Sequence, residues 1–113
     1  MKKFLKIELG SRGEVENVEV VNTTYELVED EYDYKYDDLS KDSDNIPYLE
    51  EFASIDTNEE KGVVLYGFSE EDTTYYIDFD KNEDLCEMLI SNWESENEDF
   101  SDCMEELYFQ LQL

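Results

Sequence analysis

The chain has 113 residues, of which 33 are Asp or Glu and eight are Lys or Arg, so its formal net charge is −25 at pH 7. Such a surface repels nucleic acid and anionic membranes, which excludes both as direct partners, whereas it attracts a basic protein. The hydrophobic fraction of 40% and the aromatic fraction of 14% are too high for a disordered acidic tail. The length predicts one acidic domain over residues 1–113.

The N-terminal run MKKFLKIEL contains no apolar stretch typical of an export signal or a membrane span. We therefore expect a cytoplasmic location. In that compartment thiols stay reduced, so Cys86 and Cys103 are expected to be two buried thiols instead of a disulfide.

Apolar and polar residues alternate over residues 3–9, which predicts a half-buried strand. A turn over residues 10–13 and a β-rich run over residues 14–21 follow, and together these segments predict a β-hairpin.

Aromatic and aliphatic residues recur at helical spacing over residues 25–39, and Thr23 or Thr24 offers an N-cap. The alternation of Tyr32, Tyr34 and Tyr36 would also suit a strand, but the helical interpretation is preferred. Residues 37–47 read as a loop.

The segment 48–55 is ambiguous between a short helix and a strand. Residues 63–68 and 73–79 predict two strands around the turn 69–72. In the second strand, alternation places Tyr75, Ile77 and Phe79 on one face and Tyr76, Asp78 and Asp80 on the other.

Two helices are expected at the end of the chain, over residues 83–94 and from residue 101 onward. The core stripe expected for the first helix consists of Leu85, Met88, Leu89 and Trp93, widened by Cys86 and Ile90. The predicted fold class is α+β, with an antiparallel β-sheet formed from hairpins and a C-terminal pair of α-helices.

Motifs for catalysis are absent from the sequence. Histidine, a Gly-rich phosphate loop and a Gly-x-Ser-x-Gly motif are all missing, so we expect no enzyme and no cofactor. Asp78, Asp80, Asn82 and Asp84 have the early spacing of a calcium-binding EF-hand loop. That loop would need glycine where Glu83 stands and a glutamate where Leu89 stands, so no metal site is expected.

Rows of carboxylates are the feature that predicts function. In a helix over residues 25–39, Glu26, Asp30, Asp33 and Asp37 would align in a row about 16 Å long. Asp78 and Asp80 would project about 6.6 Å apart from one face of a strand. Duplex DNA carries one charge per about 1.7 Å of its axis, so rigid rows of carboxylates can substitute for its phosphates.

From Val63 onward the order of motifs is a hairpin (VVLYGF, then TTYYIDFD), a helix ending in Asn92 and Trp93, an acidic link (ESENED) and a last helix (SDCMEELYF). This order resembles the small acidic anti-CRISPR proteins of phages and prophages, which inhibit Cas9 by mimicking DNA. The N-terminal half has no counterpart in that family.

The resemblance implies binding in the basic cleft where arginines of Cas9 read the short motif that flanks the target. The acids that it places there are Glu70, Glu71 and Asp72 at the hairpin tip and Glu94, Glu96, Glu98, Asp99 and Asp102 around the link. Four further acids, Asp33, Asp37, Asp78 and Asp80, complete the expected partner-binding set.

Two alternatives remain open from composition. An acidic immunity protein that neutralises a basic nuclease toxin would present the same kind of surface. A halophilic or calcium-buffering protein would also be acidic, but it would depend on molar salt or on calcium for folding.

Overall fold

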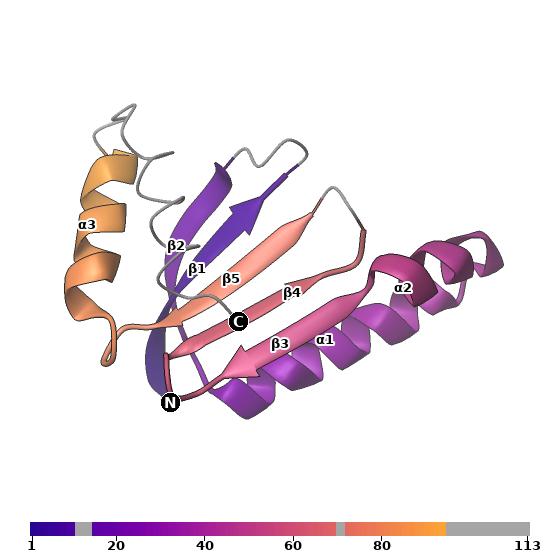
Figure 1. Ribbon diagram of the computed structural model, residues 1–113, viewed down its shortest axis with the longest axis horizontal. Coiled ribbons are helices and arrows are strands. Elements are labelled where there is room, and N and C mark those ends of the chain that lie inside the picture. Colours follow the sequence, from indigo (N-terminus) through magenta and orange to yellow (C-terminus); the bar gives the residue numbers. More distant parts are fainter. Residues whose placement is uncertain (11–14, 70–71, 95–113) are drawn as a thin grey trace.

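The computed structural model describes residues 1–10, 15–69 and 72–94 (Figure 1). In this part of the chain five strands form one antiparallel sheet in the order β2-β1-β5-β4-β3. The elements are β1 (Lys2–Leu9), β2 (Val15–Thr23), α1 (Tyr25–Ser40), the 3-10 turn η2 (Ser43–Asn45), α2 (Ile46–Phe52), β3 (Ser54–Asn58), β4 (Val63–Gly67), β5 (Thr73–Asp78) and α3 (Glu83–Glu94).

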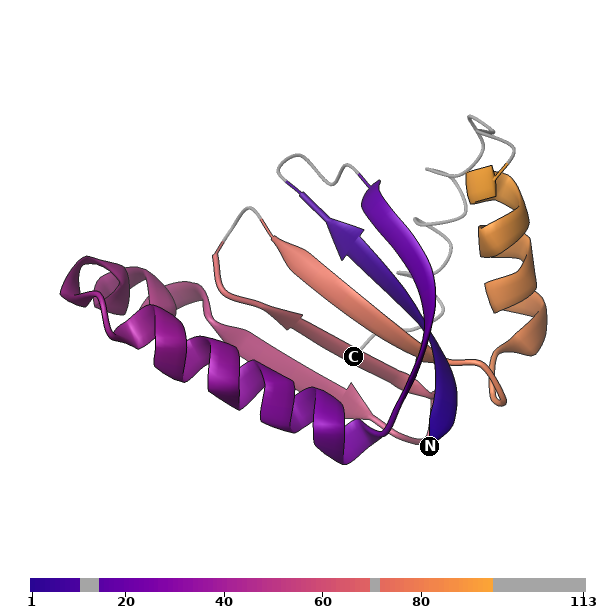
Figure 2. The same ribbon diagram turned by 180° about the vertical axis from the view of Figure 1, so that it is seen from behind.

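Both faces of the sheet are covered, one by α1 and the other by α3 (Figures 1 and 2). Strand side chains alternate between two hydrophobic clusters because successive residues point to opposite faces. The cluster under α1 is built on Phe4, Val28, Val64, Tyr66 and Tyr76. The cluster under α3 is built on Leu5, Ile7, Val63, Tyr75, Ile77, Phe79, Cys86 and Leu89.

The N-terminal half confirms the predicted hairpin and helix. Strand β1 pairs with β2 from Lys2 opposite Thr23 onward. Thr24 is the N-cap of α1, and its side-chain oxygen accepts a hydrogen bond from the backbone N–H of Leu27 at 3.1 Å. Val28 is fully buried against the sheet, so packing selects the helix over the competing strand.

The segment expected to be a loop over residues 37–47 is mostly ordered into helical turns. Helix α1 continues to Ser40, and α2 begins at Ile46 with Pro47 in its first turn, where the missing N–H of proline is not needed. The ambiguous segment 48–55 contains both candidates: α2 ends at Phe52, and β3 then pairs antiparallel with β4.

The hairpin of β4 and β5 is confirmed. The expected solvent exposure of one face of β5 is wrong. Tyr75 and Ile77 lie in the cluster under α3 and Tyr76 lies under α1, as alternation requires, but neither face is open. Asp78 is consequently fully buried.

Helix α3 has the predicted bounds, but its buried stripe is centred on Cys86 and Leu89. Met88 and Trp93, which were expected in the stripe, are exposed. Met88 lies two residues after Cys86, about 200° around the helix, and therefore on the solvent side. Burial raises the pKa of the Cys86 thiol to about 12, as suits the buried thiol predicted there. Cys103 lies outside the described residues.

The α+β class with an antiparallel sheet is confirmed, but the helices are not arranged as a C-terminal pair. Two of the three α-helices in the described ranges, α1 and α2, lie between β2 and β3, and the last described helix is α3. The second member of the expected pair, from residue 101, falls outside the described residues. No helix in the part of the chain that the structure describes is long and apolar enough to cross a membrane.

Candidate protein-binding surface

The inner face of α1 is fixed to the sheet by polar contacts as well as by its buried apolar residues. The hydroxyl of Tyr76 donates to Glu31 Oε2 at 2.9 Å. Lys35 Nζ donates to the hydroxyl of Tyr66 at 3.1 Å and lies 3.2 Å from Glu31 Oε1. Burial opposes ionisation of Glu31, but the bonds from Tyr76 and Lys35 outweigh it and hold its pKa below the ordinary value. The inward-facing acid is therefore ionised and neutralised.

The outer face of α1 carries the acidic row, which we define as Glu26, Asp30, Asp33 and Asp37. All four side chains are exposed. Among the described residues none of them has a cationic partner within ion-pair distance. The last turn of α1 contains no basic residue, although the negative end of the helix dipole favours one there. The helix thus keeps an electrostatically unfavourable arrangement on its solvent side.

Two large exposed side chains, Leu27 and Tyr34, lie beside the acidic row. Leu27 is exposed, and Tyr34, which follows Asp30 by four residues, is 77% exposed. A tyrosine with its ring and hydroxyl both accessible is common in protein-binding surfaces, because it adds contact area and retains a polar end. The acidic row therefore has the composition of a contact surface.

Asp72, expected at the tip of the β4–β5 hairpin, is exposed but also organises its turn. Its Oδ1 accepts from the backbone N–H of Phe68 at 3.1 Å and of Ser69 at 2.8 Å, and from the Ser69 hydroxyl at 2.9 Å. Asp72 lies close to the C-terminal end of α1, since it lines one pocket with Leu39. Asp72 and Asp37 are therefore at the same end of the molecule.

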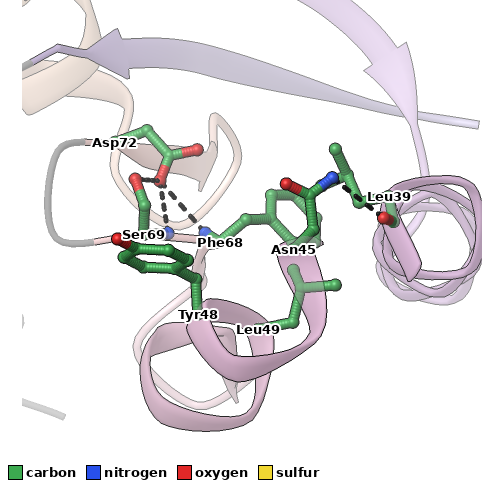
Figure 3. Close-up of a pocket in the computed structure, with 7 residues that line it drawn as sticks. All are labelled: Leu39, Asn45, Tyr48, Leu49, Phe68, Ser69 and Asp72. Atoms are coloured by element: carbon green, nitrogen blue, oxygen red, sulfur yellow. Dashed lines mark hydrogen bonds between the residues drawn. The ribbon is translucent and has the colours of Figure 1, made fainter. Parts of the chain in front are cut away.

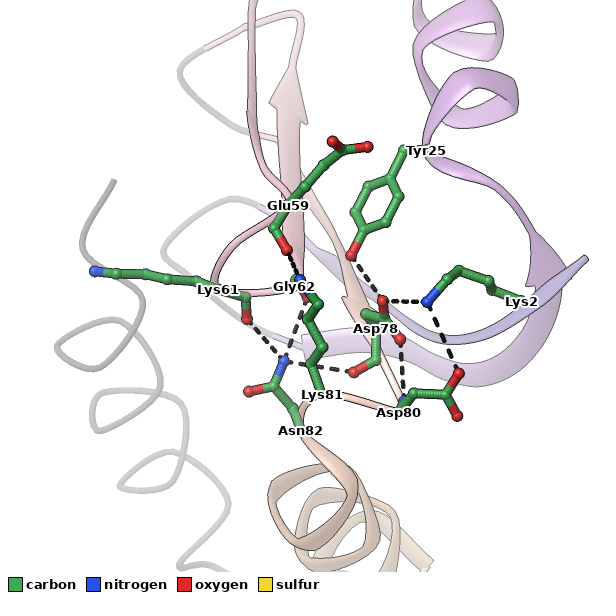
Figure 4. A network of polar contacts seen from close by, with 9 residues as sticks. All are labelled: Lys2, Tyr25, Glu59, Lys61, Gly62, Asp78, Asp80, Lys81 and Asn82. Atoms are coloured by element: carbon green, nitrogen blue, oxygen red, sulfur yellow. Dashed lines mark hydrogen bonds and ion pairs between the residues drawn. The ribbon is translucent and has the colours of Figure 1, made fainter.

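Asp78 belongs to a buried network and not to the surface where it was expected (Figure 4). Its Oδ2 lies 2.9 Å from Lys2 Nζ and accepts from the hydroxyl of Tyr25 at 2.8 Å. Its Oδ1 accepts from the backbone N–H of Asp80 at 3.0 Å. Burial opposes ionisation, but these bonds prevail and hold the pKa of Asp78 below its usual range. Asp80 itself is exposed and 3.8 Å from Lys2.

In the turn between β5 and α3, residues with EF-hand-like spacing stabilise the fold through hydrogen bonds. The Asn82 carboxamide donates from Nδ2 to the backbone carbonyl of Lys61 at 2.9 Å, which ties this turn to the β3–β4 turn. Gly62 stands opposite with φ of 76°, a conformation that favours glycine. No group of three or more potential metal ligands occurs within residues 1–10, 15–69 and 72–94.

Glu94, a described acid of the expected set, lies away from the acidic row. Glu94 is exposed at the end of α3, on the other face of the sheet from α1 (Figure 1). The other six expected binding residues lie outside the described residues: Glu70, Glu71, Glu96, Glu98, Asp99 and Asp102. Of the six that the structure describes, Asp33 and Asp37 lie on α1, and Asp72 lies near its C-terminal end, where it lines a pocket with Leu39. Asp78 and Asp80 both lie near Lys2.

Sequence reasoning overlooked the acids of α2, β3 and the following turn. These are exposed on elements that border α1: Glu50, Glu51, Asp56, Glu59 and Glu60. Thr57 of β3 donates to Glu29 of α1 at 2.9 Å, which ties the two elements together. These acids are visible in the sequence, but the ambiguous assignment of residues 48–55 left their position relative to α1 unpredicted.

A pocket of about 310 Å³ adjoins the C-terminal end of α1 (Figure 3). Its lining comes from α1, the η2–α2 segment and the β4–β5 turn. The residues are Leu39, Asn45, Tyr48, Leu49, Phe68, Ser69 and Asp72.

No protein-family model, curated protein or solved structure matches this chain.

Proposed function

We propose that this protein is an inhibitor that binds the basic, nucleic-acid-binding cleft of another protein and occupies it in place of DNA. The observation that carries the proposal is the charge segregation of α1. Its inward acid, Glu31, is neutralised by Lys35, whereas no cation of the described residues lies within ion-pair distance of the exposed acidic row. A basic partner would supply the missing cations.

The rigidity of α1 supports binding by presentation of preformed charges. A row about 16 Å long spans the rise of several base pairs, and the exposed acids of α2 and β3 add charges beside it. The Glu31–Tyr76 and Lys35–Tyr66 contacts hold the helix on the sheet before any partner arrives. Little conformational entropy would then be lost on association. Charge attraction would also accelerate the encounter.

The partner that we favour is guide-loaded Cas9 in the cytoplasm, on the resemblance of the C-terminal half to anti-CRISPR proteins. Cas9 reads its flanking motif with arginines, and carboxylate–arginine pairs are strong and directional. The protein would act by binding alone, without catalysis, metal or cofactor. An immunity protein directed at a basic nuclease would use the same surface, and the partner captured below separates the two.

The test compares two variants of equal net charge. In the first, Asp30, Asp33 and Asp37 become Asn. In the matched control, the exposed Glu16, Glu19 and Glu87, away from the acidic row, become Gln. Each protein is used to capture guide-loaded Cas9 after nuclease treatment, at low and moderate salt, beside an unrelated supercharged acidic protein.

We expect the α1 variant to lose at least about tenfold in affinity, or about 1.4 kcal/mol, while the control variant retains its affinity. Equal losses in both variants would mean that only bulk charge matters. If the wild type captures no more Cas9 than the unrelated acidic protein does, Cas9 is not the target, and a nuclease toxin encoded beside this gene becomes the partner to test.

A further inference from the structure

The pocket beside α1 combines apolar walls with oxygen acceptors, and the proposed function does not use it. Leu39, Leu49 and Phe68 form much of its wall. Tyr48 stands at its edge with 62% of its surface exposed (Figure 3). The centroid of its ring lies 6.5 Å from that of Phe52, with the two rings 28° from parallel. An exposed aromatic face held in place by a neighbouring ring is suited to cover a flat ligand group.

The side chains of Asn45 and Asp72 are held in place at this pocket by hydrogen bonds, and each has an oxygen atom that takes no part in these bonds. Asn45 Nδ2 donates to the backbone carbonyl of Leu39 at 3.0 Å, so its Oδ1 points away from Leu39 and toward Phe68 (Figure 3). Asp72 Oδ1 accepts the three turn hydrogen bonds, and its Oδ2 points away from those donors. One side of each group is therefore committed to the fold while the other is available to a ligand.

The negative charge around the pocket favours a positively charged ligand. The described lining residues include no lysine or arginine. The pocket lies at the C-terminal end of α1, where the helix dipole is negative. The C-cap residue there, Lys41, lies 3.7 Å from Asp38, and the exposed Asp42 and Asp44 are the N-cap and a residue of the adjoining η2 turn. A ligand with a planar cation and an apolar stem would match the acceptors, the aromatic face and the aliphatic wall together.

We propose that the pocket receives an arginine side chain of the basic partner, with its guanidinium between the Tyr48 ring and the oxygens of Asp72 and Asn45. Arginine fits better than lysine because its planar fork can stack on a ring and donate to two acceptors at once. This assignment rests on the proposed function for the origin of the arginine. The pocket would then be the anchoring point of a surface whose remaining attraction comes from the acidic row.

The pocket can be tested without the partner. The full-length protein is titrated with N-acetyl-arginine-methylamide and, separately, with N-acetyl-lysine-methylamide, and binding is followed by ¹H–¹⁵N chemical shifts. We expect saturable shifts at Tyr48, Phe68 and Ser69, with the arginine probe binding about two- to fivefold more tightly than the lysine probe.

Three variants locate the binding. Asp72→Asn removes the charge but keeps an Oδ1 acceptor for the turn, and Tyr48→Ala removes the aromatic face from an exposed position. Both should abolish the arginine preference, whereas Glu19→Gln, which removes a charge from β2 at the far edge of the sheet, should preserve it.

Shifts spread over the acidic row with equal affinity for both probes would overturn the pocket assignment and leave the proposed function intact. The absence of shifts at the pocket would overturn it as well. Conversely, a saturable arginine site in a protein that fails to bind Cas9 or any nuclease would support the pocket and refute the partner class.

Discussion

Asp78 carries a charge in the interior of the protein, and its donors explain how the fold tolerates it. Lys2, the hydroxyl of Tyr25 and the backbone of Asp80 together supply bonds to both carboxylate oxygens. These donors come from β1, α1 and the turn after β5. The side chain therefore joins the N-terminal strand and the first helix to the end of β5.

We expect Asp78→Asn to lower the free energy of unfolding by about 1–3 kcal/mol, because the hydrogen bonds to the charged carboxylate are weakened and the Lys2 ammonium loses its nearest counter-ion. Urea titration monitored by circular dichroism measures the change. Asp80→Asn is the control, since the Asp80 side chain is 76% exposed and should change stability by less than about 0.5 kcal/mol. Equal effects of the two substitutions would show that the buried network does not stabilise the fold.

The pH dependence of the same pair has a defined sign. Because the pKa of Asp78 is lower in the folded protein than in the unfolded chain, its stabilising contribution is present above the unfolded pKa of about 3.9 and is lost as pH falls through the folded value. The difference in stability between wild type and Asp78→Asn should therefore shrink on acidification from about pH 6 to about pH 3. Using the difference removes the background of the surface acids. A constant or growing difference would contradict the assignment.

Helix α1 combines its proposed binding role with a destabilising charge pattern. Asp37 lies in a last turn without any basic residue, close to the negative end of the helix dipole. Asp37→Lys should raise the free energy of unfolding by about 0.3–1 kcal/mol while weakening binding to guide-loaded Cas9. Urea titration and a binding isotherm on the same sample test both halves. A variant that is less stable, or that binds as tightly as wild type, would contradict this account of α1.

Local patterns predicted most of the elements because they depend on neighbours in sequence. The bounds of α3 and the N-cap at Thr24 follow from helical spacing and capping chemistry within a few residues. The short segment from Ile46 to Asn58 could not be assigned, because α2 and β3 are each too short for a decisive period and β3 is defined by its pairing with β4. The position of α1 over the sheet is likewise a tertiary property.

In the whole molecule, the sequence predicted the exposed acidic row of α1, but it predicted neither the burial of Asp78 nor the pocket. The alternation of residues along β5 separates its two faces but does not show that helices cover both of them. The burial of Asp78 therefore could not be predicted. The pocket was not foreseen because Leu39 and Asp72 are brought together only by the docking of α1 and α2 beside the β4–β5 turn. The acidic row was predicted correctly as exposed, since it follows from the helical period alone.

We propose that the carboxylates of α1 occupy the place of DNA phosphates, and competition with DNA is the most direct test of this proposal. A fluorescent target duplex bound to guide-loaded Cas9 is titrated with this protein at low and moderate salt, and the displaced duplex is measured by anisotropy. We expect the wild type to displace the duplex, less effectively as salt rises. The variant with Asp30, Asp33 and Asp37 changed to Asn should displace little of it. Duplex that stays bound at saturating protein, or that the variant displaces as well as the wild type does, would contradict the proposal.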